Sequence, residues 1–245
     1  MKIAVTGAAG FLGRALLPEL ARRHEVRAVD LESSAGDPPV ARGDVLELAD
    51  MEELCRDMDA VVHLACAAWD DKLTEAENET RILETRLKGT YNVLQAAAAG
   101  VRRVVQVSDL CALSGYDEDL MVSEDFLPLP DTSARQQSVY LSELVGREFA
   151  RSHSGLVLTL RLGKLVHVDQ LPQDAVFEDD WLAVADAVAA ILRALEIDGY
   201  DGLGDWGLYN LAADVPRKRY SLLKIQSGKF AFSPTEDFAA WRKEV

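Results

Sequence analysis

Hydrophobic positions along the chain follow two patterns, short apolar runs and stretches of helical spacing. The mainly apolar runs, which predict buried strands, lie at 2–5, 26–29, 60–65, 103–108 and 155–162. Between them, apolar residues recur every three or four positions, as Leu12, Leu16 and Leu20 do, and this spacing predicts amphipathic helices. Because strands alternate with helices, we expect the α/β class: a doubly wound parallel sheet with helices on both faces.

The same patterns set the expected bounds of the other elements. Short strands are predicted at 40–42 and 207–211. Helices are predicted at 12–23, 48–58, 74–99, 134–152 and 191–195, with short ones at 221–228 and 235–243. Asp50 is the expected N-cap of the second helix, because its carboxylate can accept a hydrogen bond from an unpaired amide of the first turn.

Three glycines spaced three residues apart, Gly7, Gly10 and Gly13, join the first strand to the first helix. Gly7 permits a tight turn, Gly10 lets the backbone approach a phosphate, and Gly13 allows close packing of helix on strand. The helix N-terminus adds free N–H groups and the positive end of the helix dipole. The turn therefore predicts a site for the pyrophosphate of a dinucleotide, with a purely structural turn as the alternative.

Asp30 ends the second strand, ~20 residues after the glycine turn. Dinucleotide-binding sites commonly have an acidic residue at this distance from their glycine turn. A carboxylate at this place accepts hydrogen bonds from the adenosine ribose hydroxyls and repels a 2′-phosphate. Glu32 adds negative charge nearby, and no arginine closely follows Asp30. The sequence therefore predicts NAD, and not NADP, as the cofactor.

Charge and composition narrow the classes of function. The formal net charge of −15 argues against nucleic acid and anionic membrane surfaces, which both need a positive face on their partner. A basic segment at 215–235 is either a contact for an anionic small molecule or a solvated face. The three cysteines lie far apart, so we expect neither a disulfide framework nor a metal site. No run reaches the ~18 apolar residues of a membrane span and no leader is evident, so a cytoplasmic location is expected.

The segment 6–13, TGAAGFLG, resembles the Thr-Gly-x-x-Gly-x-x-Gly motif of short-chain dehydrogenases/reductases, especially their extended epimerase/dehydratase branch. The segment 86–94 resembles that branch's Asn-x-x-Gly-Thr-x-Asn-Leu-Leu, with Arg86 in place of the first Asn. The resemblance covers nearly the whole chain and implies a single Rossmann-type domain, 1–245. Its small substrate lobe would be built mainly from about 164–180 and 205–245. The resemblance also implies a homodimer that pairs the helices 74–99 and 134–152 of two copies.

The resemblance further implies which residues contact the dinucleotide. Asp44 and Val45, after the third strand, would frame the adenine, whereas His63 would be structural. The implied cofactor contacts are Gly7, Ala9, Gly10, Phe11, Leu12, Gly13, Asp30, Leu31, Asp44, Val45, Leu64, Ala65, Val107 and Glu143.

The chain departs from the family pattern where proton transfer would occur. Alignment of the helix 134–152 puts Val139 at the position of the catalytic Tyr and Glu143 at that of the catalytic Lys. The family's Tyr exchanges a proton with the substrate hydroxyl while the Lys lowers its pKa, and Val139 cannot take over that role. Tyr140 is rotated by about 100° around the helix from position 139. Asp109 stands where the family's catalytic hydroxyl is expected, and Ser108 lies one position early.

Two functional hypotheses follow. In the first, the chain binds NAD without the proton machinery and serves as a cofactor-sensing or regulatory protein. In the second, it is an active NAD-dependent oxidoreductase or epimerase that acts on a sugar-like alcohol with an atypical carboxylate as acid or base. A vestigial pocket fits poorly with the retained glycines and Asp30. The candidate catalytic residues are Ser108, Asp109, Tyr140 and Glu143.

Overall fold

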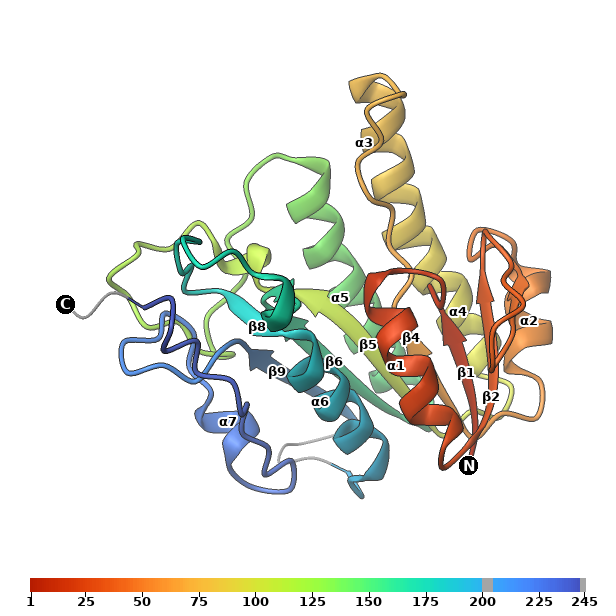
Figure 1. The fold of residues 1–245 in the computed structure, drawn as a ribbon. Helices are drawn as coiled ribbons and strands as arrows, with labels where there is room; N and C mark the ends of the chain where they lie inside the picture. The colour runs from red at the N-terminus through yellow and green to blue at the C-terminus, as the bar shows by residue number, and fades with distance from the viewer. Residues whose placement is uncertain (200–204, 243–245) are drawn as a thin grey trace.

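The computed structural model describes residues 1–199 and 205–242, and its centre is a sheet of seven parallel strands (Figure 1). The strands lie in the order β3-β2-β1-β4-β5-β6-β9. The chain starts in the middle of the sheet, winds outward to β3 and then crosses back to β4, so the winding direction reverses between β1 and β4. This arrangement confirms the predicted α/β class and the doubly wound sheet.

All seven strands end on the same edge of the sheet because they run parallel. The strands are β1 (Lys2–Thr6), β2 (Glu25–Asp30), β3 (Val40–Arg42), β4 (Ala60–His63), β5 (Arg103–Asp109), β6 (Leu156–Leu162) and β9 (Trp206–Leu211). A separate two-stranded sheet pairs β7 (Lys164–Val166) with β8 (Trp181–Ala183).

Helices cover both faces of the large sheet. The α-helices are α1 (Phe11–Ala21), α2 (Leu48–Cys55), α3 (Glu75–Leu83), α4 (Gly89–Ala97), α5 (Ala134–Ser152), α6 (Val184–Glu196) and α7 (Leu223–Gln226). Three other helical turns are η1 (Glu84–Lys88), η2 (Leu110–Leu113) and η3 (Val168–Gln170). Among the described helices, none combines the length and the apolar character that a bilayer crossing requires.

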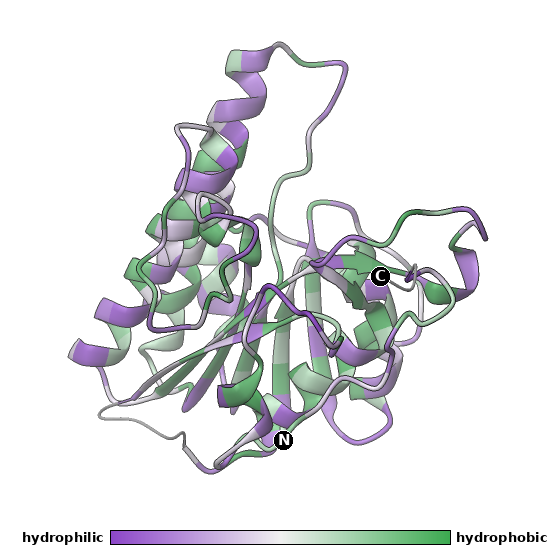
Figure 2. Ribbon diagram, turned by 90° about the vertical axis from the view of Figure 1, so that its left-hand side faces the viewer, coloured by the Kyte–Doolittle hydropathy of each residue, from purple (hydrophilic) through white to green (hydrophobic). Residues whose placement is uncertain are grey.

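Successive side chains of the strands enter two separate cores. On one face, Val105 and Leu158 pack with residues of α1 and α6, among them Leu16. On the other face, Val61 and Val104 pack with residues of α2, α4 and α5. Figure 2 shows the apolar strands at the centre and the most polar segments on the outside. Since helices cover both faces, the strands appear in the sequence as nearly unbroken apolar runs.

The long helix predicted at 74–99 contains a wider turn in its middle. At its start, the Thr74 hydroxyl accepts a hydrogen bond from the Glu77 amide, and the Glu77 carboxylate accepts one from the Thr74 amide. After α3, η1 forms one π-helical turn before α4 continues from Gly89. The π-turn, a feature frequent at functional sites, carries Arg86. Figure 1 shows α3 projecting well beyond the sheet, above α4.

The predicted N-cap of the second helix is wrong. Glu47 occupies the N-cap position of α2, and its side chain makes no capping hydrogen bond. Asp50 lies in the first turn and accepts a hydrogen bond from the Asp44 amide at 2.8 Å. Its carboxylate therefore fixes the loop after β3 and does not cap the helix.

The helix predicted at 235–243 does not form within its described part, 235–242, and Lys243 lies outside the described residues. The buried Asp186 carboxylate accepts hydrogen bonds from the amides of Thr235 and Glu236, at 2.9 and 3.0 Å. Phe238 adopts a positive φ of 53°, which a helix cannot accommodate. The helix predicted at 221–228 shortens to α7.

The end of the chain packs against the small sheet through an aromatic cluster. Trp181 of β8 lies 5.5 Å from Phe238 and 5.6 Å from Phe177 between ring centroids, and Trp241 covers Phe238. These contacts join the predicted lobe segments 164–180 and 205–242 in one apolar cluster. The assignment of this lobe to a substrate stays a prediction.

Candidate functional site

The glycine turn packs against the end of β4 more closely than a side chain would permit. Gly7 has a φ of 69°, and a Cβ at that position would lie 2.6 Å from the Ala65 nitrogen. A Cβ on Gly13 would lie 2.5 Å from the carbonyl oxygens of Gly7 and Ala8. Both glycines are therefore required by the approach of backbone to backbone, as the sequence predicts.

The start of α1 presents unmatched amides at this turn. Gly10 is the N-cap residue, no side chain caps the helix, and no acidic residue stands in its first turn. The first amides of α1 and the positive end of its dipole are thus free to bind an anion. Arg14 donates a hydrogen bond to the Ala9 carbonyl at 2.6 Å, which adds a positive charge beside the turn.

Asp30 connects the end of β2 to the glycine turn. Its carboxylate accepts hydrogen bonds from the amides of Ala9 at 2.9 Å and Leu31 at 2.7 Å. The half-buried carboxylate therefore stands directly beside the glycine turn. This is the position that a residue binding the adenosine ribose requires.

The segment after β3 is held by α4. The Val45 carbonyl accepts a hydrogen bond from the Asn92 side chain at 2.9 Å, and a Cβ on Gly89 would lie 2.7 Å from Val45. Asp44 accepts a hydrogen bond from the Leu46 amide. The predicted adenine contacts, Asp44 and Val45, are thus placed on the same edge as Asp30.

The structure places the other predicted cofactor residues along this same edge or just inside it. Leu64 and Ala65 directly follow β4, and the half-buried Val107 lies near the end of β5. The exposed ring of Phe11, at the start of α1, meets the His167 ring at 4.7 Å between centroids. This contact joins the glycine turn to the segment that follows β7.

His63 is enclosed at the end of β4. Its Nδ1 lies 2.7 Å from the Thr6 hydroxyl oxygen, and its Nε2 lies 3.0 Å from that of Thr90. Burial, with a smaller contribution from the Arg86 charge, lowers the pKa of His63 to about 4. The ring is therefore neutral near pH 7 and links β1, β4 and α4, which agrees with a structural role.

Glu143 forms a buried ion pair. Its carboxylate accepts hydrogen bonds from Arg161 Nε at 2.9 Å and Nη2 at 2.7 Å, and from the Ser108 hydroxyl at 2.5 Å. The side chains of Arg161 and Glu143 are 1% and 4% exposed. The structure thus brings Ser108 and Glu143 together, but in a pair closed off from solvent.

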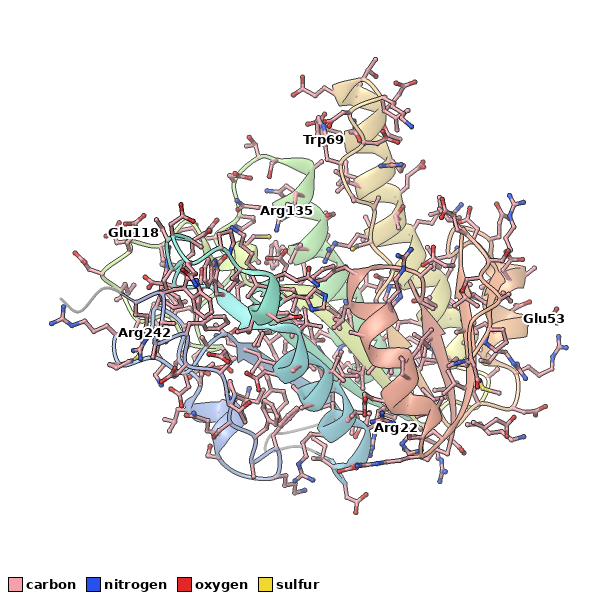
Figure 3. The ribbon with its side chains drawn as sticks, viewed as in Figure 1. Arg22, Glu53, Trp69, Glu118, Arg135 and Arg242 are labelled. Atoms are coloured by element: carbon pink, nitrogen blue, oxygen red, sulfur yellow. The ribbon has the colours of Figure 1, made fainter. Side chains whose placement is uncertain are left out.

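Asp109 lies at the end of β5 and is paired with Arg135 at the start of α5, 2.8 Å away. It also accepts a hydrogen bond from the Cys111 amide at 2.8 Å. Burial by itself would raise the pKa of Asp109, but the Arg135 guanidinium and the Cys111 amide outweigh it, so this pKa lies below its usual range. Figure 3 shows Arg135 at the upper end of α5, next to this edge.

The comparisons with known proteins agree with this geometry. A model of the NAD dependent epimerase/dehydratase family matches residues 3–166. The L-arabinose 1-dehydrogenase (NAD(P)(+)) of Haloferax volcanii is 30% identical over 223 residues, which cover 80% of this chain and 82% of that protein. The chain belongs to this family.

Solved structures share the fold of this family member. Glucuronic acid dehydrogenase from Chromohalobacter salexigens has a TM-score of 0.81 at 23% identity, with 98% of this chain and 86% of that one covered. Uronate dehydrogenase from Agrobacterium tumefaciens has a TM-score of 0.80 at 22% identity, with 96% and 84% covered. A mutant of the latter was solved in complex with NAD.

The two positions that the sequence aligns with the epimerase/dehydratase family's Tyr and Lys both face inward in this chain. Val139 is fully buried, and Glu143 is held in its ion pair. Tyr140 is half-buried, and its hydroxyl makes no hydrogen bond to the described residues. The structure therefore does not bring Tyr140 to Asp109 or Glu143 through any hydrogen bond.

Sequence reasoning missed the two arginines that neutralise the candidate carboxylates. Arg135 and Arg161 come from α5 and β6, and neither lies at a helical spacing of three or four residues from its partner. The structure places Arg161 opposite Ser108 in the register of β5 and β6, and this register cannot be read from the sequence alone. No spacing or motif in the sequence predicts the pairing of Arg135 with Asp109, which lies 26 residues earlier in the chain.

The acidic loop 117–133 lies over the end of the sheet. Val122 exchanges backbone hydrogen bonds with Arg219 and Ser221, at 2.7 and 2.9 Å. The Glu124 carboxylate accepts a hydrogen bond from the Asn210 amide at 2.7 Å, and burial raises its pKa.

Between this loop and the end of the chain lies a cavity of about 1080 Å³. It is lined by residues of the segments 118–121, 176–179, 215–219 and 239–242. Glu118 and Arg242, which both line it, lie on the left-hand side of the molecule in Figure 3. In the described ranges, 1–199 and 205–242, no cluster of three or more metal-ligating side chains is found.

We expect Glu143→Ala to lower the free energy of unfolding by about 3–5 kcal/mol, because the variant leaves the Arg161 charge buried without a partner. Urea denaturation monitored by circular dichroism measures this change. Glu148→Ala, which removes an exposed carboxylate from the same helix, is the matched control and should have a much smaller effect. Equal effects of the two substitutions would contradict a stabilising role for the buried pair.

Proposed function

We propose that this chain is an NAD-dependent oxidoreductase that oxidises a sugar-like alcohol. The proposal rests chiefly on the Asp30 carboxylate, which stands beside an uncapped helix N-terminus and a glycine turn that admits no side chains. The activities of relatives, an arabinose dehydrogenase and uronate dehydrogenases, support a sugar or sugar acid as substrate.

The chain offers contacts for each part of the cofactor. The first amides of α1 would hold the pyrophosphate, Asp30 the adenosine ribose, and Asp44 with Val45 the adenine. Leu31, Leu64, Ala65 and Val107 would border the bound dinucleotide. A ribose contact from Glu143 would require its carboxylate to leave Arg161. NAD, when bound, supplies a hydride acceptor for the substrate carbon.

The cavity beside the loop 117–133 is the proposed place for the rest of the substrate. Its lining includes the basic residues Arg217, Lys218 and Arg219 of the segment that the sequence singled out. Lys218 is paired with Asp214, and Arg219 donates to backbone carbonyls. Arg217 makes no hydrogen bond or ion pair with any described residue, so it is available to an anionic group on the substrate.

Proton transfer in this chain would depend on carboxylates, because no tyrosine stands at the predicted position. Asp109 lies at the strand end where the hydroxyl of the family is expected, with Arg135 beside it. The second candidate function, cofactor sensing without turnover, is favoured by one observation. Val139 is fully buried, and the buried Glu143 carboxylate is paired with Arg161.

The cofactor part of the proposal is tested by calorimetric titration with NAD and NADP. We expect NAD to bind more tightly, and Asp30→Asn to weaken NAD binding roughly 10-fold, because a hydrogen bond to a charged group is worth about 1.5–3 kcal/mol. NADP binding should weaken less, since the substitution also removes the repulsion of its 2′-phosphate. Glu52→Gln, on the exposed face of α2, serves as the control. Equal affinities of the unsubstituted chain for NAD and NADP would contradict the role of Asp30.

Turnover is tested in the same preparation by the absorbance of NADH with a panel of aldoses and sugar acids that includes L-arabinose and D-glucuronate. We expect NADH formation with at least one of them, and a loss of at least about 10-fold in kcat for Asp109→Asn, because the site loses a carboxylate that Arg135 holds in place. Glu53→Gln, distant from the edge, should retain full activity (Figure 3). Tight NAD binding without turnover would instead support the sensing function.

We also propose a homodimer through α4 and α5. An apolar groove of about 440 Å³ runs between these helices and is lined by Leu87, Leu94, Leu141, Leu144 and Val145. Tyr91, on its rim, is 52% exposed. A second copy of the same two helices would bury this surface in an isologous four-helix contact.

Leu144→Glu should convert the dimer into a monomer, because it places a charge in the apolar groove. Light scattering at micromolar concentration measures the molar mass. Arg147→Ala, on the exposed side of α5, should leave the mass unchanged. A monomeric unsubstituted chain would refute the dimer.

A further inference from the structure

The cavity of about 1080 Å³ between the loop 117–133 and the end of the chain has apolar walls. The apolar side chains on its lining are Leu120, Met121, Val176, Phe177, Val215 and Trp241. Met121 and Val176 are 58% and 70% exposed. Large apolar side chains that stay open to water around a concave site are typical of a surface that a ligand covers.

The wall formed by the loop 117–133 is anchored next to Met121. Val122 is fully buried and forms a parallel bridge with Tyr220. Its amide donates a hydrogen bond to the Arg219 carbonyl at 2.7 Å, and its carbonyl accepts one from the Ser221 amide at 2.9 Å. Neighbouring side chains of an extended segment point to opposite sides. Because Val122 enters the core, Met121 is held open to the cavity.

The aromatic cluster beside the small sheet supports another wall. Phe177 is half-buried and lies 5.6 Å from Trp181 and 5.9 Å from Phe238 between ring centroids. Trp241 lies 6.3 Å from Phe238, and its indole nitrogen donates a hydrogen bond to the Pro172 carbonyl at 2.7 Å. Both Phe177 and Trp241 also line the cavity. This wall is therefore preorganised, which lowers the cost of ordering it around a ligand.

The cavity lies at the edge of the sheet where a substrate is expected. The loop 117–133 follows β5 and the segment 215–219 follows β9, so both leave the carboxyl ends of strands of the large sheet. Ligands of open α/β sheets bind in the crevice outside these strand ends. The volume of the cavity is at the upper end of the range of about 300–1,000 Å³ for small-molecule sites. It therefore has room for more than a single sugar ring.

A free sugar would match the aliphatic part of this lining poorly. Leu120, Val176 and Val215 offer no hydrogen-bonding group. A hydroxyl that leaves water to lie against such side chains loses its hydrogen bonds, which costs free energy. An aryl or alkyl group instead gains free energy when its apolar surface is removed from water.

The charges on the lining argue against a nucleotide diphosphate as the occupant. Three exposed carboxylates line the cavity: Glu118, Asp119 and Asp179. Lys218 and Arg242 are already paired with the carboxylates of Asp214 and Asp237. Arg217 makes no ion pair with a described residue and can donate hydrogen bonds to a single carboxylate. Two phosphate charges, however, would be repelled by the three carboxylates.

We propose that this cavity binds an apolar substituent of aryl size, carried by the substrate on the side away from the carbon that is oxidised. This inference rests on the proposed oxidoreductase function and names the class of alcohol that the site takes. Met121 and Val176 pack against the substituent, and the rings of Phe177 and Trp241 form the fixed part of its wall. The polar part of the substrate then lies toward the cofactor.

The first test needs neither cofactor nor turnover. The chain is labelled with ¹³C at the methionine methyl groups, and the Met121 signal is assigned by its absence in Met121→Gln. The ligands are phenyl and methyl β-D-glucopyranoside, which differ only in the apolar group. We expect the Met121 signal to shift with an affinity at least about 10-fold higher for the phenyl compound. The signal of Met51, which is fully buried, should stay unchanged.

Three results of this titration would overturn the proposal. The first is an equal affinity for the two glucosides, and the second is a Met121 signal that neither compound moves. The third is a higher affinity for UDP-glucose than for the phenyl compound, which would assign the cavity to a nucleotide.

The second test uses calorimetric titration of variants with the same two glucosides. Met121→Gln and Val176→Asn should each lower the preference for the phenyl compound to about 3-fold or less and leave the affinity for the methyl compound unchanged. Both side chains are more than half exposed, so the fold should be retained. Leu127→Gln is the matched control, because Leu127 is 77% exposed on the same loop but does not line the cavity. An unchanged preference in both cavity variants overturns the proposal.

NADH formation with the two glucosides and the sugar panel separates this inference from the proposed function. Binding of the phenyl compound at Met121 without any turnover supports the apolar site and overturns the oxidoreductase function. Turnover of free sugars, with no preference for the phenyl compound, supports the oxidoreductase function and overturns the apolar site. Turnover with a lower KM for the phenyl than for the methyl glucoside supports both.

Discussion

The buried ion pair of Glu143 and Arg161 is the interaction on which the arrangement of α5 at the carboxyl edge of the sheet depends. It connects the middle of α5 to β6, and the Ser108 hydroxyl adds β5 to the same contact. Removing two charges from water costs several kcal/mol per ion, and only a two-pronged contact with good geometry offsets this cost. The pair therefore favours a single placement of α5 on the sheet, and with it the position of Arg135 beside Asp109.

The parallel sheet contributes the second constraint. Because all its strands run in one direction, the glycine turn, Asp30 and the loop after β3 meet at one edge although they lie far apart in the sequence. At this edge Gly7 packs so closely against Ala65 that a side chain on Gly7 would collide with the backbone after β4. The proposed dinucleotide site is thus a consequence of the topology together with the glycine turn.

Charge in this acidic chain is arranged unevenly. The formal net charge is −15, yet the two candidate catalytic carboxylates, Asp109 and Glu143, are each paired with an arginine. The Arg135 guanidinium keeps the pKa of Asp109 below its usual range, and both ion pairs fix the positions of their carboxylates.

The sequence by itself determined the alternation of strands and helices, the glycine turn and the place of Asp30, because each depends on local spacing and local backbone conformation. Tertiary structure alone decided the partners of Asp109 and Glu143 and the absence of a helix at 235–242. The helix at 235–242 is absent because the amides of Thr235 and Glu236 donate hydrogen bonds to the Asp186 carboxylate. Asp186 lies in α6, about 50 residues earlier in the chain. Such contacts join residues that lie far apart in the chain, so the pattern of neighbouring residues in the sequence cannot predict them.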